Sequence, residues 1–389
     1  MVEGAKMRIL LATDTKVYVK DGRYYADNSF VPVVKRYFDA FQEIILCTRT
    51  VNVSEIPTFC AEISQYIYDY IAIDSLKSVL LNKYNQQIIN AISNCDIVVS
   101  RVPSIVSYRV ADIAIRQNKP YMTEAMGCAW DAYWNHGILG KSIALYMFLK
   151  MKKLVYRASY STYVTEKFLQ SRYPSKNNSI NASNVSIGKL EDRVLKKRIN
   201  KIKKRDSSKL VLLTAAAVNV RYKGHEYVIR AIKSLCDSGI DITYYLAGKG
   251  DQTFLRNLSK KYQVEDRVIF LGGLSRQDVI NAMDMADIYI QPSKQEGLPR
   301  SIIEAMSRGC PVLGANTAGI PELIQNECVF KRGSVSSVIS SIKMILNEDL
   351  ERIAIENFSK AKEYEEEILD NRRQLYYEKI KRELLEKSI

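Results

Sequence analysis

From Lys209 onward, short runs of β-branched and apolar residues alternate with amphipathic segments of helical length. Such alternation builds β/α units around a parallel sheet. The expected strands are residues 209–217, 242–248, 267–273, 288–293 and 311–316. The expected helices are residues 225–239, residues 276–286 behind a cap at Ser275, and a segment that begins after Pro299. The pattern predicts a doubly wound α/β domain.

The amino-terminal half repeats this logic, with expected strands at residues 7–12, 43–48, 95–100 and 119–123 and helical stretches such as 75–93. A chain of 389 residues is too long for one ordinary core and fits two domains. The expected division is into residues 1–206 and 207–359, joined in the basic stretch 196–208, with a terminal helix 360–389 that packs back on the first domain. The predicted fold class is therefore α/β, with two doubly wound Rossmann-like domains facing each other across a cleft.

Composition excludes several classes of protein. Hydrophobic residues make up 47% and charged residues 26%, without low-complexity tracts, so neither a disordered nor a fibrous chain is indicated. The first apolar run, residues 7–12, is far shorter than the roughly 20 residues of a membrane span, and we expect a cytosolic protein. Seven cysteines without a C-x-x-C pair favour reduced thiols over zinc ligands or disulfides.

The net charge of +14 is concentrated in one segment. Residues 141–209 contain 18 Lys and Arg against four acids. A segment of this kind suits a polyanion, either an anionic membrane leaflet or a nucleic acid. The alternative is a solvated helix face followed by a basic linker.

Within that segment, residues 146–156 place large apolar and aromatic side chains beside three lysines, Lys150, Lys152 and Lys153. This composition is typical of a helix at the headgroup boundary of a membrane, and it predicts peripheral binding to an anionic surface. The alternative is that Met147, Leu149 and Tyr156 face the core of the first domain.

The most informative stretch is QPSKQEGLPRSIIE, residues 291–304, which leaves a predicted strand, turns, and enters a helix with Pro299 near its first position. The free N–H groups at such a helix start bind anions, and a diphosphate is the natural occupant. Glu296 before the helix and Glu304 about one turn inside it can flank one bound molecule. Carboxylates that accept two hydrogen bonds suit vicinal hydroxyls. The alternative is a turn residue and a helix-surface acid.

This stretch resembles the E-x7-E motif of glycosyltransferase family 4, retaining transferases of the GT-B fold. Other segments agree with that family in order and spacing: YKGHE at 222–226, LAGKG at 246–250, FLGG at 270–273, ADIYIQPS at 286–293, and GCPV through GIPEL at 309–323. In the first half, residues 122–141 and 163–174 resemble loops of capsule and O-antigen members. The resemblance implies an acceptor-binding first domain and a nucleotide-sugar-binding second domain.

By position, the resemblance implies that Glu304 holds the nucleotide ribose, Glu296 holds the transferred sugar, and Lys223 neutralises the diphosphate. Gly272 and Leu274 would lie against the base. The remaining donor contacts would come from the same stretch, at Gly297, Leu298 and Ser301.

The sequence departs from the family pattern at a few positions. Where members usually carry an arginine five residues before the lysine, this chain has Val218. Arg221 or Arg300 would then supply the missing charge, although each can equally face solvent. Where many members carry a histidine in the first domain, this chain has Glu124, a predicted substrate contact. His136 follows, either as a catalytic or sugar-contacting residue or as a structural one.

The resemblance therefore implies a retaining transfer of a hexose-type sugar from a nucleotide-diphosphate sugar to a saccharide acceptor, lipid-linked, in cell-surface polysaccharide synthesis. The enzyme would lie in the cytoplasm, on the inner face of the membrane. No D-x-D motif occurs in the sequence, so neither a metal nor a further cofactor is implied. The alternatives are a nucleotide-sugar epimerase, a sugar phosphorylase or another enzyme of this fold. A nucleic-acid-binding protein that uses residues 141–209 is a weaker alternative, because no nucleic-acid motif accompanies the charge.

Overall fold

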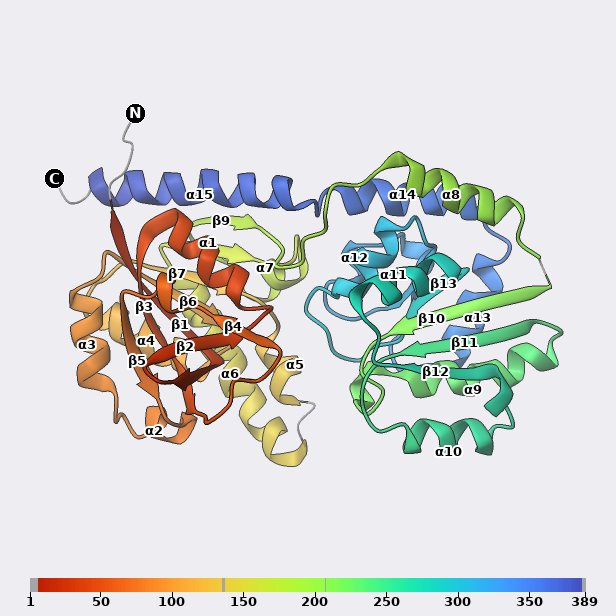
Figure 1. Ribbon diagram of the computed structural model, residues 1–389, viewed down its shortest axis with the longest axis horizontal. Coiled ribbons are helices and arrows are strands. Elements are labelled where there is room, and N and C mark those ends of the chain that lie inside the picture. The colour runs from red at the N-terminus through yellow and green to blue at the C-terminus, as the bar shows by residue number, and fades with distance from the viewer. Residues whose placement is uncertain (1–5, 135–136, 207, 387–389) are drawn as a thin grey trace. The chain divides into compact units, whose positions relative to one another are not determined.

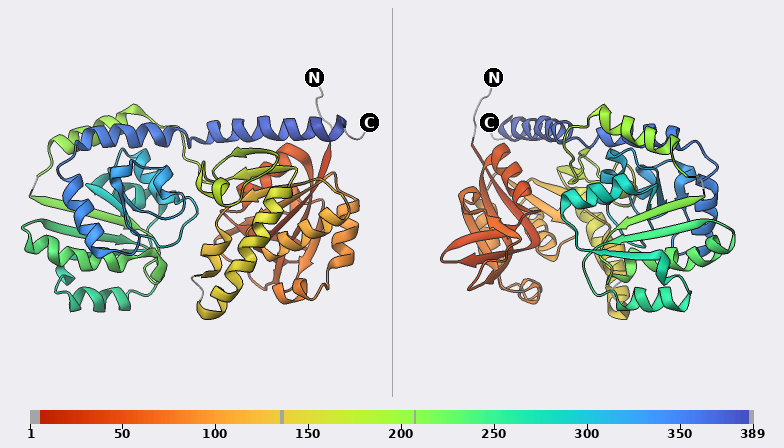
Figure 2. Two further views of the ribbon diagram at one scale, coloured as in Figure 1. Left: turned by 180° about the vertical axis from the view of Figure 1, so that it is seen from behind. Right: turned by 45° about the vertical axis from the view of Figure 1, so that its right-hand side comes forward.

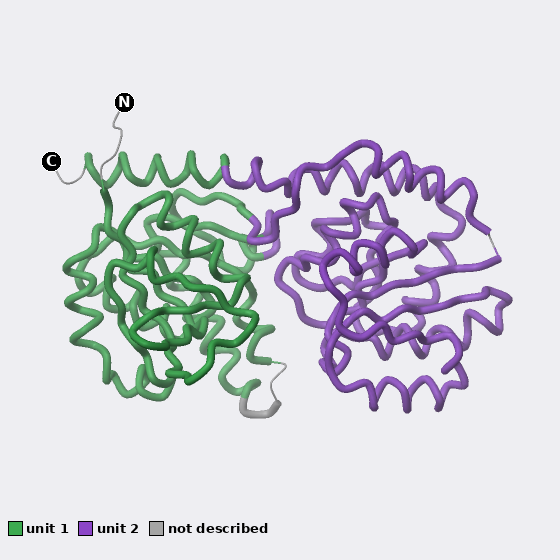
Figure 3. The backbone as a smooth tube through the Cα atoms, in the orientation of Figure 1, with its two compact units in different colours: residues 1–164, 169–182, 371–389 green, residues 165–168, 183–370 purple. Residues whose placement is uncertain are grey.

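The computed structural model describes residues 6–134, 137–206 and 208–386 (Figure 1). The chain forms two compact units, shown in different colours in Figure 3. Unit 1 consists of Met1–Val164, Leu169–Ala182 and Asn371–Ile389. Unit 2 consists of Thr165–Phe168 and Ser183–Asp370. Each unit is a doubly wound α/β domain, as the sequence predicts.

Among the described residues of unit 2, six parallel strands form one sheet in the order β12-β11-β10-β13-β14-β15. Their bounds are β10 (Lys209–Ala215), β11 (Asp241–Ala247), β12 (Val268–Gly272), β13 (Ile288–Gln291), β14 (Val312–Ala315) and β15 (Val329–Phe330). The first five confirm the strands predicted from the sequence. The order runs outward in both directions from β10 and β13, which makes their carboxyl ends the switch point where such sheets bind ligands.

Two groups of helices cover this sheet, and Figure 1 shows them on opposite faces. One group consists of α9 (His225–Asp237), α10 (Thr253–Lys261) and α13 (Val335–Ile345). The other consists of α8 (Asp192–Lys203), α11 (Arg276–Met285), α12 (Arg300–Ser307) and α14 (Leu350–Lys362). As the sequence predicts, Ser275 caps α11, because its Oγ accepts a hydrogen bond of 3.2 Å from the Asp278 N–H.

In the described part of unit 1, nine strands form a mixed sheet. The parallel strands are β1 (Met7–Lys20), β3 (Gln42–Asn52), β5 (Asp69–Ile73), β6 (Ile97–Val102), β7 (Tyr121–Ala125), β8 (Tyr160–Tyr163) and β9 (Asn178–Asn181). Two antiparallel strands, β2 (Arg23–Asp27) and β4 (Cys60–Glu62), extend it beyond β1. The strands predicted at 7–12 and 43–48 are confirmed as parts of β1 and β3, and those predicted at 95–100 and 119–123 begin two residues before β6 and β7 and overlap them.

The helices of unit 1 are α1 (Val31–Phe41), α2 (Leu76–Leu80), α3 (Asn85–Ser93), α4 (Ile105–Arg116), α5 (Ala129–Trp134), α6 (Gly137–Arg157) and α7 (Phe168–Arg172), whose first residue belongs to unit 2. The stretch 75–93 forms two helices rather than one, because the chain turns at Asn82, whose φ of 64° is left-handed. Figure 2 shows α6 lying across the sheet of unit 1.

The boundary between the units differs from the sequence expectation. Residues 183–206 belong to unit 2, and the basic stretch expected to be a linker forms α8 instead. Arg198 of α8 is 4% exposed and donates to the carbonyl oxygens of Ala286 and Met283, each at 2.7 Å. A cation is favourable beside the carbonyls that end a helix, here those that end α11. Part of the positive charge therefore stabilises unit 2.

The carboxyl-terminal segment forms two helices, α14 and α15 (Glu366–Glu386), and α15 enters unit 1 at Asn371. Tyr376 and Tyr377 of α15 are buried in the core of unit 1, and the Tyr377 ring centroid lies 5.3 Å from that of Phe41. The last helix thus contributes core side chains to the unit that contains the first strand.

In the described ranges, no helix combines the length and the apolar character that crossing a bilayer requires. The seven cysteines all lie in these ranges and are free thiols, as expected, and five of them are buried.

Candidate functional site

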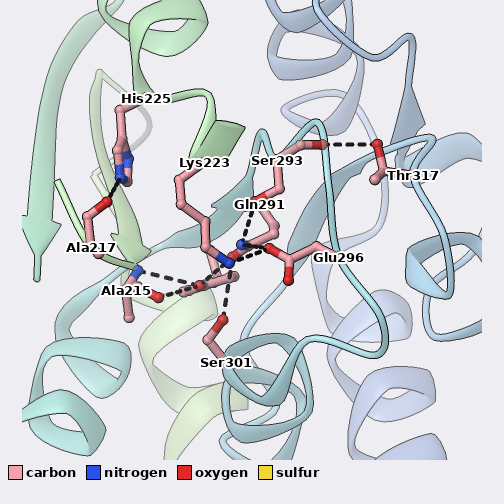
Figure 4. A network of polar contacts seen from close by, with 10 residues as sticks. Ala215, Ala217, Lys223, His225, Gln291, Ser293, Glu296, Ser301 and Thr317 are labelled. Atoms are coloured by element: carbon pink, nitrogen blue, oxygen red, sulfur yellow. Dashed lines mark hydrogen bonds and ion pairs between the residues drawn. The ribbon is translucent and has the colours of Figure 1, made fainter. Parts of the chain in front are cut away.

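Lys223 and Glu296 meet at the switch point of unit 2 (Figure 4). Lys223 ends the short 3-10 helix η2 (Arg221–Lys223) that follows β10, and Glu296 lies in the loop that follows β13. The Lys223 Nζ donates to Glu296 Oε1 at 2.8 Å, and the two side chains are 22% and 9% exposed. The fold therefore brings together two residues that are 73 positions apart in sequence and were assigned to one site.

Gly224 explains how the two loops come so close. Its φ of +74° is left-handed, and a Cβ at this position would lie 2.0 Å from the carbonyl oxygen of Pro292. The Lys294 N–H also donates to the Tyr222 carbonyl oxygen at 2.7 Å. Only glycine combines this backbone angle with this approach, so Gly224 allows the turn carrying Lys223 to lie against the loop carrying Glu296.

Gln291, at the end of β13, donates to the same carboxylate oxygen of Glu296 as Lys223 does (Figure 4). Its side chain is almost completely buried, and its Nε2 donates to Glu296 Oε1 at 3.0 Å and to Ser293 Oγ at 2.8 Å. Its Oε1 accepts from the Tyr289 hydroxyl at 2.6 Å and from Ser301 Oγ at 3.3 Å. Burial raises the pKa of Tyr289, which keeps the phenol protonated and able to donate.

Neither Gln291 nor Tyr289 was singled out from the sequence. A glutamine that ends an apolar strand directly before the E-x7-E stretch is the signal that was available, because a buried amide needs hydrogen-bond partners. We infer that Gln291 is a positioning residue that fixes the orientation of Glu296.

Replacing this amide by an apolar group of similar size tests the network. Gln291→Leu removes the acceptor that lies 2.6 Å from the buried Tyr289 hydroxyl and leaves that hydroxyl only the Ala215 carbonyl oxygen at 3.5 Å. We therefore expect unit 2 to lose about 1–3 kcal/mol of unfolding free energy. Chemical denaturation measures this loss. Gln277→Leu is the matched control, because Gln277 is exposed on α11. Equal stability of the Gln291 variant and wild type would contradict the proposed network.

The start of α12 and Glu304 form the second part of the site. Pro299 precedes the helix and no side chain caps it, so its first N–H groups are available to a ligand. Glu304 lies one turn further, with its side chain 15% exposed and its Oε1 3.9 Å from Arg300 Nη1. Burial raises the pKa of Glu304, while Arg300 and Arg276 act in the opposite direction. The carboxylate is therefore held in a partly desolvated position, where a hydroxyl ligand would be favourable.

The two candidate arginines lie in different surroundings. Arg221 donates from Nε to Glu226 Oε2 at 2.8 Å, and its guanidinium lies 3.6 Å from the centroid of the Phe254 ring. The side chains of Arg221 and Arg300 are 58% and 51% exposed. Val218 is buried in the core of unit 2, so that position supplies no charge. Both arginines remain candidates for the diphosphate contact.

The other predicted donor contacts lie on loops at the same edge of the sheet, because the carboxyl ends of parallel strands share one edge. Gly272 ends β12 with a φ of +70°. Leu274 and Leu298 are half-buried and pack against the core. The Gly297 carbonyl oxygen accepts from the Gly319 N–H at 3.0 Å, which holds the turn after Glu296. Their contacts with a donor stay predictions.

His225 follows Gly224 and has a structural environment. It is 2% exposed, and its Nε2 lies 3.1 Å from the Ala217 carbonyl oxygen (Figure 4). Burial lowers its pKa to about 4, so the ring is neutral at pH 7. A neutral ring whose Nε2–H donates to this carbonyl joins the start of α9 to the end of β10.

Glu124 lies in unit 1, at the carboxyl end of β7. It is buried and accepts from Arg101 Nε at 2.7 Å, from the Tyr37 hydroxyl at 2.9 Å and from Arg36 Nη2 at 3.3 Å. These contacts place the carboxylate in a buried network, which favours a structural role over the predicted substrate contact. His136 lies outside the described residues, and its role stays a prediction.

Comparison with known proteins identifies the family. Residues 196–363 match the family described as glycosyl transferases group 1. Over 380 residues, the chain is 31% identical to Protein CapJ of Staphylococcus aureus, and the match covers 95% of this chain and 91% of that protein. The chain belongs to the group 1 glycosyltransferases. This glycosyltransferase is also 34% identical to the putative colanic acid biosynthesis glycosyltransferase WcaL of Escherichia coli, over 26% of this chain and 27% of WcaL.

Solved structures confirm the GT-B fold of this group 1 glycosyltransferase. Sucrose-phosphate synthase from Thermosynechococcus elongatus aligns with a TM-score of 0.66 and 13% identity, over 97% of this chain and 99% of that one. HepE of Anabaena in complex with UDP aligns with a TM-score of 0.65 and 13% identity, over 96% and 100%. The match to the group 1 family, together with the likeness to CapJ, confirms the enzyme class predicted from the sequence, a glycosyltransferase.

Proposed function

We propose that this glycosyltransferase moves a hexose-type sugar from a nucleoside-diphosphate sugar to a saccharide acceptor, with retention of configuration at the anomeric carbon. The observation that carries the proposal is the meeting of Lys223 and Glu296 at the switch point, beside the uncapped start of α12. A cation, free N–H groups and two carboxylates suit a diphosphate flanked by a ribose and a sugar. The structure of HepE with UDP-glucose, a neighbour of the same fold, supports a donor of this class.

In the proposed reaction, the bond between the anomeric carbon and the diphosphate oxygen breaks. The oxygen of the acceptor hydroxyl bonds to the same face of that carbon, and the hydroxyl proton passes to the departing diphosphate. The sugar passes through an oxocarbenium-like state, so the main task is to stabilise the departing diphosphate. Lys223, one of the two arginines and the dipole of α12 act on that charge. Glu296 fixes the sugar through its hydroxyls, and no metal is required in this scheme.

The ion pair between Lys223 and Glu296 has a role before the donor arrives. Each charge neutralises the other at 2.8 Å, which offsets the cost of holding both in a largely desolvated place. The donor then offers a diphosphate to the lysine and hydroxyls to the glutamate. Gln291 keeps its hydrogen bond to Glu296 during this exchange, so the carboxylate stays oriented when the lysine turns away.

We further propose that the acceptor is a lipid-linked saccharide in cell-surface polysaccharide synthesis. The likeness to WcaL, described as a colanic acid biosynthesis glycosyltransferase, supports this class of pathway. A lipid-linked acceptor requires the enzyme to work at a membrane surface. The proposed location is therefore cytoplasmic and peripheral, on the inner face of the membrane.

A donor screen by thermal shift tests the proposal. A nucleotide sugar that binds only the folded protein raises its unfolding free energy by about 2.7 kcal/mol at a concentration of 100 times its Kd. We expect one nucleotide to give this shift across its sugar derivatives, and Glu304→Gln to reduce it. Glu265→Gln, at an exposed glutamate of unit 2, should keep it. A screen without any stabilising nucleotide sugar would refute the donor class, and an unchanged shift in Glu304→Gln would refute the ribose contact.

The same binding measurement has an expected dependence on pH. Only the ionised Glu304 accepts hydrogen bonds from two hydroxyls, and burial raises its pKa in the free protein. Donor affinity should therefore rise with pH through that pKa, which is raised from the ordinary value of a glutamate, and then level off. In Glu304→Gln this part of the pH dependence should disappear.

A further inference from the structure

The helix α6 of unit 1 has two different faces. Its inward face is buried and consists of Ala144, Met147, Met151, Leu154 and Val155. On the other face, four large side chains are exposed to solvent: Leu145 by 54%, Tyr146 by 63%, Leu149 by 54% and Tyr156 by 48%. Their spacing of three, four and seven positions places them on about a third of the helix circumference.

The exposed face contradicts part of the core alternative for this segment. Met147 packs inward, as the core alternative requires, whereas Leu149 and Tyr156 do not. A solvated helix normally presents polar residues outward, so an outward row of leucines and tyrosines indicates a surface that binds something.

Cations border this apolar row on both sides. The exposed Lys152 and Lys153 lie between Leu149 and Tyr156 in sequence, and Arg157 follows. The Lys176 N–H donates to the Tyr156 carbonyl oxygen at 3.3 Å, which adds an exposed lysine beside the end of the helix. The sequence of α6 contains no acidic residue.

Not every cation of the segment belongs to this face. The Lys150 Nζ forms an ion pair with Asp112 of α4, so the Lys150 charge is neutralised within unit 1. At the other end of the helix, the Lys141 Nζ lies 5.3 Å from the centroid of the Trp134 ring, and Trp134 is 40% exposed. Tryptophan and tyrosine favour the boundary between water and hydrocarbon, because one end of each ring is polar.

We propose that the exposed face of α6 docks on an anionic lipid bilayer. Its leucines and tyrosines enter the boundary between headgroups and acyl chains, and its lysines and Arg157 reach the lipid phosphates. Two copies of this face would repel each other through their like charges, which disfavours self-association. This inference deepens the proposed function, since it names the surface that meets the bilayer holding a lipid-linked acceptor.

Vesicle sedimentation with the full chain tests the proposal. Vesicles of phosphatidylcholine with phosphatidylglycerol should bind the protein at low salt and release it at high salt, and phosphatidylcholine alone should not bind it. The double variant Lys152→Ala, Lys153→Ala should weaken binding by about 25-fold, since each basic residue contributes about fivefold. The double variant Tyr146→Ser, Leu149→Ser should reduce binding with the charges intact.

The matched control is Lys260→Ala, Lys261→Ala, an adjacent exposed pair at the end of α10 in unit 2. It removes the same charge from another surface and should leave binding unchanged. An equal loss of vesicle binding in this control would show that the protein binds vesicles through its net charge rather than through α6, and would overturn the proposal. Equal binding to neutral vesicles, or none to either kind, would overturn it as well.

The donor-induced thermal shift separates this proposal from the proposed function. Both α6 variants should keep the shift of the wild type, because the nucleotide-sugar site lies in unit 2. Loss of vesicle binding with an intact shift supports the assignment of α6. An intact shift without any vesicle binding in the wild type refutes docking alone.

Discussion

Glu296→Ala should reduce sugar transfer by at least about 10²–10³-fold while unit 2 remains folded. The carboxylate accepts hydrogen bonds from Lys223 and Gln291, and Glu296 is not part of the hydrophobic core of unit 2. Its removal leaves the Gln291 amide bonded to Ser293, and Lys223 is partly exposed, so neither partner is left without hydrogen bonds. The variant loses the group that fixes the sugar at the reacting carbon, an effect comparable to losing one electrostatic contact with the transition state.

Turnover with a donor identified by the screen measures this effect. Glu296→Gln keeps the volume and one acceptor oxygen, so a loss of similar size in both variants assigns the effect to the negative charge. The control Glu265→Gln should have normal turnover. Near-normal turnover of purified, folded Glu296→Ala would refute the catalytic assignment and leave the family membership standing.

Lys223→Ala should lower kcat by about 10²–10³-fold, since one well-placed donor to developing charge contributes roughly 3–4 kcal/mol. The charge on the diphosphate increases as the sugar leaves, so the loss should appear in kcat more than in the donor KM. Lys233→Ala is the matched control, because Lys233 forms a surface ion pair with Asp237 on α9. A change confined to KM would indicate that Lys223 only binds the donor.

The same assay distinguishes the two arginines. If Arg300→Ala lowers kcat and Arg221→Ala does not, the second positive charge comes from the start of α12. The opposite result assigns it to Arg221, between Glu226 and Phe254. Normal turnover in both variants would indicate that Lys223 and the dipole of α12 stabilise the charge of the diphosphate without either arginine.

The sequence predicted unit 2 well because its sheet is parallel and helices cover both of its faces, so each strand appears as an apolar run between helices. Unit 1 was harder to predict. Its strands β8 and β9 span four residues each, and β9 is polar, NSIN at 178–181. The antiparallel β2 and β4 depend on pairing with β1 rather than on their own pattern. Pairing with neighbouring strands, rather than the local sequence pattern, determines where these strands form.

The candidate site was predictable in part. The K-G and E-x7-E motifs named Lys223 and Glu296, and the sheet order brought the two residues together. The motifs said nothing of Gln291, whose role depends on a side-chain orientation that spacing does not reveal. The domain boundary was missed for a similar reason. A basic stretch resembles a linker until its Arg198 is seen to donate to the carbonyls that end another helix.

The return of the chain to unit 1 in α15 predicts the effect of a truncating mutation. Unit 1 combines residues that precede unit 2 with residues from Asn371 onward, and its core is complete only when Tyr376 and Tyr377 have been translated. A stop codon shortly before position 371 would leave every strand of both sheets in the product, yet it would expose the apolar face that Phe41 shares with these tyrosines. Loss of α15 would thus act as a folding defect of unit 1, most of which is synthesised before unit 2.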